Sequence, residues 1–140
     1  MTTSRADKLG RMVSLVKLQL RLSEWQLAQL RQQERSLQDE QEWLVGALND
    51  GKPPAGSSSE SIARRLNRTS VGARAIRTQA AQQLDQVRAE SRRVKQLEQV
   101  AKAALADKLR DAEKQVLEEM TGISPAVRAW TPPPANRNKP

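Results

Sequence analysis

A long heptad pattern of apolar residues limits the fold of this sequence more than any other feature. Between residues 4 and 49, apolar side chains recur in alternating steps of four and three and fill nine of twelve positions: Leu9, Val13, Val16, Leu20, Leu27, Leu30, Leu37, Leu44 and Leu48. Ser23, Glu34 and Gln41 fill the other three. A repeat of 3.5 residues over so many turns predicts a helix that packs along another helix.

A second pattern of the same kind covers residues 58 to 121. Its apolar positions are Ile62, Leu66, Ala73, Ile76, Ala80, Leu84, Val87, Val94, Leu97, Ala101, Leu105, Leu109, Ala112, Val116 and Met120. The spacing lengthens in the C-terminal half, which predicts a looser supercoil there. Thr69, Ser70 and Gly72 are weak helix formers, so we expect a kink or break around them.

The ends of both helices carry recognisable signals. Ser4 should cap the first helix, and Asn49-Asp50-Gly51 should end it. The connector, residues 50 to 58, contains Pro53 and Pro54 and is polar. Ser57 with Glu60 predicts a capping box for the second helix, and Gly122 predicts its C-terminal end. The tail, residues 123 to 140, contains three consecutive prolines and should be extended or disordered.

Two heptad helices on a short connector most simply form an antiparallel hairpin. The sequence therefore predicts an all-α fold, with a hairpin over residues 1–122 and a tail over residues 123–140. Facing residues should have numbers that sum to about 109, which brings Glu34 close to Ala75. In this register an acidic cluster falls opposite a basic one: Glu34, Asp39, Glu40 and Glu42 against Arg64, Arg65, Arg68 and Arg74. Such charges select pairing and orientation more than they stabilise it.

The second helix is the longer one, so its end should extend beyond the first helix. Pairing should be complete by about residue 105. Four apolar residues then lack a partner within the chain: Leu109, Val116, Leu117 and Met120. Arg110 and Lys114 lie among them beside acidic residues. An unpaired apolar stripe usually meets a partner outside the chain, so these four residues are candidate partner-binding residues.

The composition excludes much catalytic chemistry. The chain has no Cys and no His, so it cannot build a thiol nucleophile, a histidine base or a Cys/His metal site. Gly46 to Lys52 matches the first part of a phosphate-binding loop, but a helix precedes it and Pro53 replaces the required hydroxyl residue. We therefore expect no enzyme activity, cofactor, metal or small-molecule substrate. We also expect a soluble cytoplasmic protein, because no apolar run reaches the length of a membrane span.

Three tryptophans are the only aromatic residues. Trp25 and Trp43 lie on or beside the first heptad stripe, and their simplest interpretation is packing against the second helix. The alternative is that one of them anchors a partner, since Trp is enriched at interface hot spots. Trp43 is the better candidate because it projects from the flank of the stripe. Trp130, in the proline-rich tail, is either disordered or part of a docking peptide.

The second helix also carries a run of basic residues. Residues 51–95 hold 10 basic and 3 acidic residues, whereas residues 1–50 are balanced at 7 and 7. Arg88, Arg92 and Arg93 are its candidate binding residues. Three interpretations stay open: a solvated face, a docking surface for an acidic protein, or a nucleic-acid-binding face. Nucleic acid is the least favoured, because no aromatic residue interleaves the run to stack on bases.

Two stretches resemble a known family. They are residues 9–48 (LGRMVSLVKLQLRLSEWQLAQLRQQERSLQDEQEWLVGAL) and residues 92–119 (RRVKQLEQVAKAALADKLRDAEKQVLEE). The chain resembles the FliJ-type flagellar export proteins and their type III secretion counterparts in the heptad leucines of the first stretch and the run from Lys95 to Glu98. The family has no short diagnostic motif.

The resemblance implies a specific role. Family members are hairpins similar to the shaft of the rotary ATPase γ subunit. They insert into the hexameric export ATPase, contact the export gate protein and recycle substrate chaperones, without being catalysts. The resemblance would place this protein in the cytoplasm, peripherally associated with the inner face of the membrane export apparatus. Its contact with the membrane would be only indirect. The alternatives are a basic coiled coil that binds nucleic acid and a purely structural coiled-coil dimer.

Overall fold

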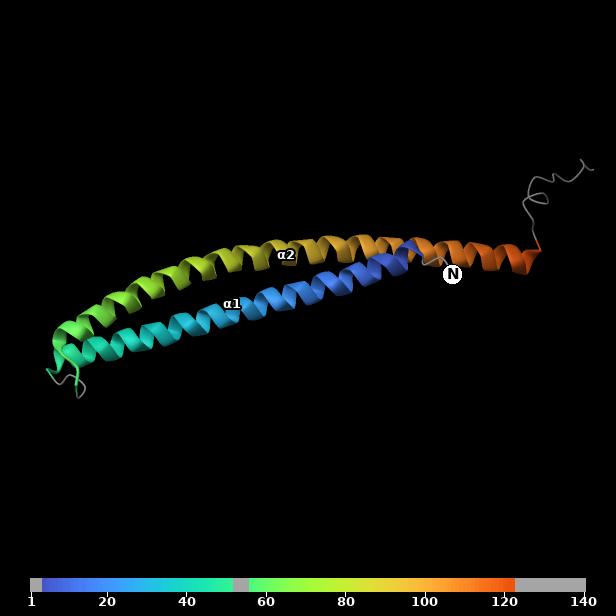
Figure 1. The fold of residues 1–140 in the computed structure, drawn as a ribbon. Helices are drawn as coiled ribbons and strands as arrows, with labels where there is room; N and C mark the ends of the chain where they lie inside the picture. The colour runs from blue at the N-terminus through green and yellow to red at the C-terminus, as the bar shows by residue number, and fades with distance from the viewer. Residues whose placement is uncertain (1–3, 52–55, 123–140) are drawn as a thin grey trace, which may run out of the picture.

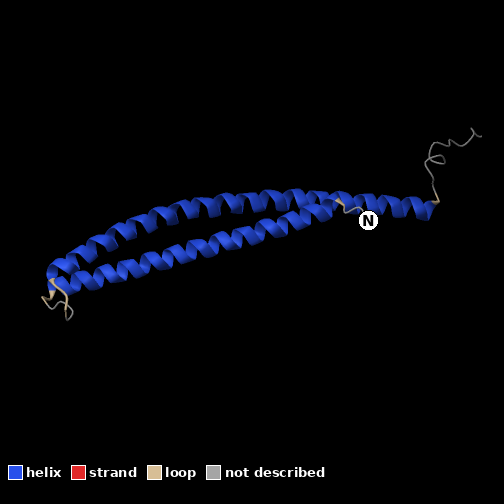
Figure 2. Ribbon diagram, in the orientation of Figure 1, coloured by secondary structure: helices blue, strands red, loops and turns tan. Residues whose placement is uncertain are grey.

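Two long helices make up the computed structural model of the protein. The structure describes residues 4–51 and 56–122, so the predicted tail and Trp130 lie outside the described residues. Helix α1 spans Arg5–Asn49 and helix α2 spans Ser59–Thr121. The helices run antiparallel along each other as a hairpin, and α2 continues past the beginning of α1 (Figure 1). The predicted all-α hairpin is confirmed, and no strand occurs in the described ranges (Figure 2).

The ends of α1 follow the sequence signals. The backbone N–H of Asp7 donates to the Ser4 hydroxyl at 3.2 Å, which caps one of the free amides of the first turn. At the other end, Asp50 closes the helix with a hydrogen bond to the Gly46 carbonyl. Gly51 then adopts a φ of 64°, a left-handed conformation that glycine reaches without strain.

The start of α2 differs from the prediction. Ser58, not Ser57, is the cap, and its partner in the capping box is Ser61 rather than Glu60. Each serine hydroxyl accepts from the other's backbone N–H, at 3.2 and 3.1 Å. Ser57 and Ser58 each have a polar side chain three residues on, Glu60 and Ser61, so either serine could start a capping box, and the chain uses Ser58. Gly122, with a φ of 63°, ends the helix as predicted.

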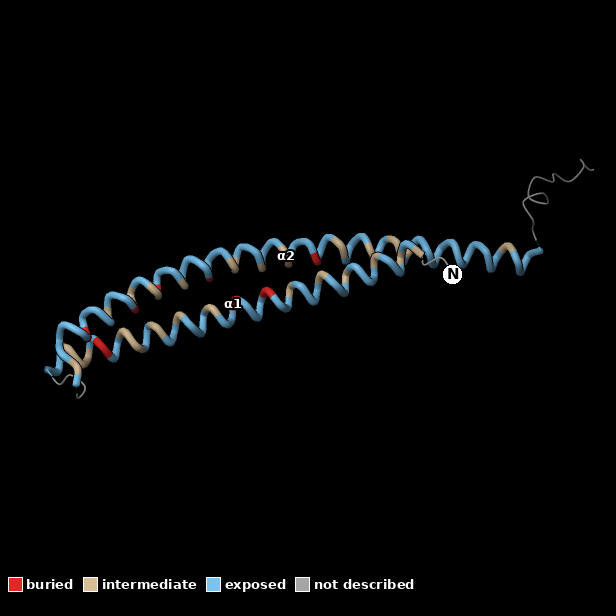
Figure 3. Tube along the Cα trace, in the orientation of Figure 1, coloured by how far each residue is buried: buried red, intermediate tan, exposed pale blue. Residues whose placement is uncertain are grey.

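The packing stripe of α1 is the predicted one. All twelve heptad positions, polar ones included, are buried or half-buried, and Leu44 is 1% exposed. The buried residues of the two helices lie on the sides that face each other (Figure 3). We call this line of contact the seam. Two helices alone cannot enclose a side chain on all sides. Most leucines of the seam are therefore half-buried rather than buried.

The break considered for α2 does not occur. The helix is continuous through Thr69, Ser70 and Gly72, because the seam uses their small size and hydroxyl groups. Thr69 is 6% exposed, and its hydroxyl donates to the Arg65 carbonyl at 2.8 Å. A Cβ at Gly72 would lie 3.8 Å from Leu37. Tertiary packing thus outweighs weak helix propensity here.

Polar contacts across the seam fix the register. The Gln41 amide donates to the Ser70 hydroxyl at 2.8 Å, and the Gln83 amide donates to the Ser23 carbonyl at 3.0 Å. The numbers in these pairs sum to 111 and 106, close to the predicted 109. Buried polar groups need partners, so a slip in register would leave these amides and hydroxyls unsatisfied.

Candidate partner-binding surface

The apolar stripe of α2 leaves the seam near residue 101. From Ile62 to Ala101 the apolar stripe coincides with the seam, and every predicted apolar position is buried or half-buried. Beyond it the seam keeps its heptad spacing and passes through half-buried Ala104. The predicted seam residue Leu105 is instead 50% exposed. The stripe rotates away because its spacing lengthens while the contact with α1 stays at 3.5 residues per turn.

The two helices stay in contact slightly further than expected. The Lys108 ammonium lies 3.3 Å from an Asp7 carboxylate oxygen, three residues beyond the predicted end of pairing. Figure 1 shows α2 continuing alone past this point. We call residues 109 to 121 the overhang.

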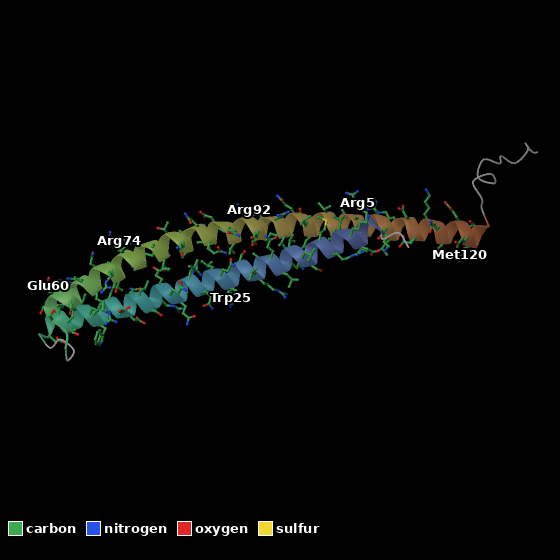
Figure 4. The ribbon with its side chains drawn as sticks, in the orientation of Figure 1. Arg5, Trp25, Glu60, Arg74, Arg92 and Met120 are labelled. Atoms are coloured by element: carbon green, nitrogen blue, oxygen red, sulfur yellow. The ribbon has the colours of Figure 1, made fainter. Side chains whose placement is uncertain are left out.

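The overhang presents all four predicted binding residues to solvent. Their exposed fractions lie between 51 and 79%: Leu109, Val116, Leu117 and Met120. Met120 lies close to the free end of α2 (Figure 4). Charged groups of both signs border them, including Arg110, which lies 3.8 Å from Asp107. The surface is therefore an apolar stripe with a mixed-charge border on a single helix.

Neither Trp25 nor Trp43 is buried between the helices. Trp25 is 59% exposed and Trp43 is 55% exposed, so neither ring packs fully against α2. The outward projection expected for Trp43 is confirmed. Trp25 belongs to a second exposed stripe on α1, which sequence reasoning missed: Leu15, Leu18, Leu22 and Trp25. Its spacing of three, four and three was present in the sequence but was hidden by the stronger seam beside it.

The basic residues of α2 fall into two groups. Near the connector, Arg65 pairs with Glu40 at 2.7 Å, as the predicted charge complementarity requires. Glu34 instead pairs at 3.0 Å with Arg77, which was not among the predicted arginines. Arg64 instead pairs with Glu60 of its own helix. These pairs are exposed, so each contributes at most about 1 kcal/mol.

The predicted complementarity is thus realised only in part. Among the described residues, no ion pair within 4 Å joins Asp39 or Glu42 to the arginines of α2.

Further along α2, the candidate residues Arg88, Arg92 and Arg93 are exposed. Over the described ranges, no ion pair within 4 Å holds any of them. Arg92 is labelled midway along the hairpin in Figure 4. The middle of α2 therefore offers unpaired positive charge.

One carboxyl group has a shifted pKa. Hydrogen bonding to the Ser4 side chain, followed by the hydrogen bond and the charge of Lys108, lowers the pKa of Asp7 below its ordinary value. Ser4, Asp7 and Lys108 thus connect the first turn of α1 to α2 at the point where the overhang begins.

The remaining surface offers shallow grooves. One follows α1 and is lined by Leu27, Arg31, Glu34 and neighbouring residues, and it is open along its length. Among residues 4–51 and 56–122, no group of three acidic side chains is placed to hold a metal ion. The same residues include no helix that is long and apolar enough to cross a membrane.

No family model matches this chain, and comparisons with curated proteins and with solved structures found no match.

Proposed function

We propose that this protein is a non-enzymatic coiled-coil adaptor of flagellar or related type III protein export. Its overhang would insert into the ring of a hexameric export ATPase, as the γ-like shaft does in the family that the sequence resembles. The export gate protein and the substrate chaperones would be its other partners. The role would place it in the cytoplasm, at the inner face of the export apparatus.

The observation that carries the proposal is the separation of the apolar stripe from the seam. If α2 served only to pair with α1, its last apolar residues would follow the seam or give way to polar ones. Leu109 and Val116 instead lie on one exposed side of a helix that has outrun its partner. A narrow stripe with a mixed-charge border suits a shaft that contacts several ring subunits in turn, because no single contact is deep.

The test is binding to a purified hexameric export ATPase. We expect Leu109→Ala with Val116→Ala to weaken binding and ATPase stimulation by about 30-fold or more, corresponding to about 2–5 kcal/mol for two central side chains. Helicity should change little, because both side chains are exposed. Val45→Ala with Val71→Ala is the matched control at the connector end, where both valines are also exposed. Wild-type binding by the overhang variant would rule out the proposal.

The unpaired arginines of α2 favour nucleic-acid binding as the second candidate. In that case Arg88→Glu with Arg92→Glu and Arg93→Glu would abolish binding to generic DNA or RNA, while the overhang variant would bind normally. Binding would also weaken steeply with salt, because the contacts would be to phosphates. The two candidates thus predict opposite results for the same pair of variants.

A further inference from the structure

The second exposed stripe of α1 lies on the side that faces away from α2. Leu15, Leu18, Leu22 and Trp25 are 56 to 66% exposed. Each lies two residues from a seam position, and two residues correspond to about 200° around a helix. The stripe thus lies opposite the seam, where nothing else in the described part of the hairpin covers it. Four large apolar side chains in one row form the kind of patch that marks an interaction site.

The stripe has the pattern of a second coiled-coil seam. It extends in heptad steps at both ends, through Lys8 and Arg11 on one side and Gln29 and Gln32 on the other. Its neighbours on both flanks are uncharged except for Arg21: Met12, Ser14, Gln19, Gln26, Ala28 and Gln33. Depletion of charge around an apolar centre is typical of the core of an interface and disfavours a charged partner such as nucleic acid.

The spacing of the stripe is symmetric about residue 20. Its positions form pairs whose residue numbers sum to 40: 15 with 25, 18 with 22, 11 with 29, and 8 with 32. Two copies laid antiparallel in this register would pair Leu15 with Trp25 of the other copy and Leu18 with Leu22, so all four apolar layers would be filled. A two-fold axis produces such self-complementary contacts.

The ends of the stripe select this orientation. In a parallel pair, Lys8 would face Lys8 and Arg11 would face Arg11, so like charges would meet in two successive layers. In the antiparallel pair these cations face the neutral amides of Gln32 and Gln29, which can accept their hydrogen bonds. The antiparallel pair also matches each bulky Trp25 with a smaller leucine, which keeps the helix spacing even along the contact.

The contact is large enough for a weak specific dimer. Residues 8 to 32 cover about 36 Å of helix. The four apolar side chains of each copy present about 450 Å², at about 100 Å² for an exposed leucine and about 150 Å² for the tryptophan. With the flanking glutamines the total passes about 1,000 Å², the lower limit for a specific interface.

We propose that a second copy of this chain binds the stripe, giving an antiparallel four-helix dimer with the α1 helices at its centre. In this dimer the two overhangs point in opposite directions. The dimer does not depend on the proposed role in export: self-association and ATPase binding are separate measurements on separate surfaces.

Sedimentation equilibrium of the full chain over a range of concentrations tests the proposal. We expect reversible dimers with a Kd on the order of micromolar. Leu18→Glu should weaken the dimer by at least about 30-fold, because each change enters a symmetric interface twice. Val71→Glu is the matched control: Val71 is 58% exposed against 57% for Leu18, but it lies on α2 near the connector. Both variants should keep wild-type helicity. A chain that stays monomeric, or a dimer that only Val71→Glu disrupts, would overturn the proposal.

Spin labels decide the orientation. The chain has no native cysteine, so single-cysteine variants label cleanly. In the antiparallel dimer, two Ser14→Cys labels are offset by about 18 Å along the axis and two Gln38→Cys labels by about 54 Å. In a parallel dimer both pairs would lie within about 20 Å. A short distance at residue 38 would therefore reject the antiparallel arrangement.

Discussion

Helix α2 behaves differently in its paired part and in its overhang, although the sequence pattern runs through both without a break. From Ile62 to Ala101 the apolar stripe and the seam are the same line, and α1 covers it. From Leu105 onward the stripe turns away from α1 and stays exposed. Heptad residues alone therefore do not identify a buried seam: the partner helix must also be present and its spacing must match.

Replacing a leucine by alanine should give the largest difference in stability between the paired part and the overhang. Leu44→Ala removes the least exposed large side chain of the seam and should destabilise the hairpin by about 2–5 kcal/mol, because it leaves a cavity between the helices. Leu117→Ala makes the same change in the overhang and should alter stability by about 0.5 kcal/mol at most. Urea denaturation followed by circular dichroism measures both. Equal losses would mean that the overhang is packed in solution.

Gly10→Ala should stabilise α1 by about 0.5–1 kcal/mol, because alanine loses less backbone entropy in a helix. A Cβ at this position would meet nothing within 4 Å, so no clash opposes the gain. Gly10 follows the seam residue Leu9 and is exposed, so the variant tests whether the space at this position is open. A loss of stability in the same denaturation experiment would show that the two helices approach each other more closely here.

The ion pair between Arg65 and Glu40 should contribute about 0.2–1 kcal/mol in a double-mutant cycle of Arg65→Ala and Glu40→Ala. The pair is partly exposed, with side-chain exposures of 56% and 32%. The coupling should shrink at high salt because exposed charges are screened. A coupling of zero would mean that this ion pair does not contribute to the stability of the hairpin.

The smallest expected effect is the pH dependence of the contact that Asp7 makes at the end of the paired part. The lowered pKa of Asp7 means that its contribution to stability is present above the pKa of the unfolded chain and is lost as pH falls through the lower folded value. We expect Ser4→Ala and Lys108→Met each to raise this pKa toward its ordinary value, which an NMR titration of the Asp7 carboxyl would measure. No response to Lys108→Met would mean that pairing ends before residue 108.

Much of the candidate surface could be predicted from the residues. The exposed positions of Leu109, Val116 and Met120 followed from the unequal helix lengths, and the outward position of Trp43 followed from its place beside the stripe. The stripe of Leu15 to Trp25 was missed, because a helix with two apolar faces has two possible seams and the stronger one was assigned first. The capping box was misplaced because Ser57 and Ser58 each have a polar side chain three residues on, and the residues alone do not choose between them.

Heptad spacing, glycine and serine signals and connector length are local properties, so the residues alone predict two helices, the approximate positions of their ends, their antiparallel pairing and an approximate register. Two further features could be read only from the packed helices: the point where the stripe of α2 and the seam part, and the continuity of the helix from Thr69 to Gly72. Both outcomes depend on the contact with α1: the weak helix formers are accommodated where Leu37 packs beside Gly72, whereas Leu105 is left exposed because the spacing of its stripe no longer matches that of the seam.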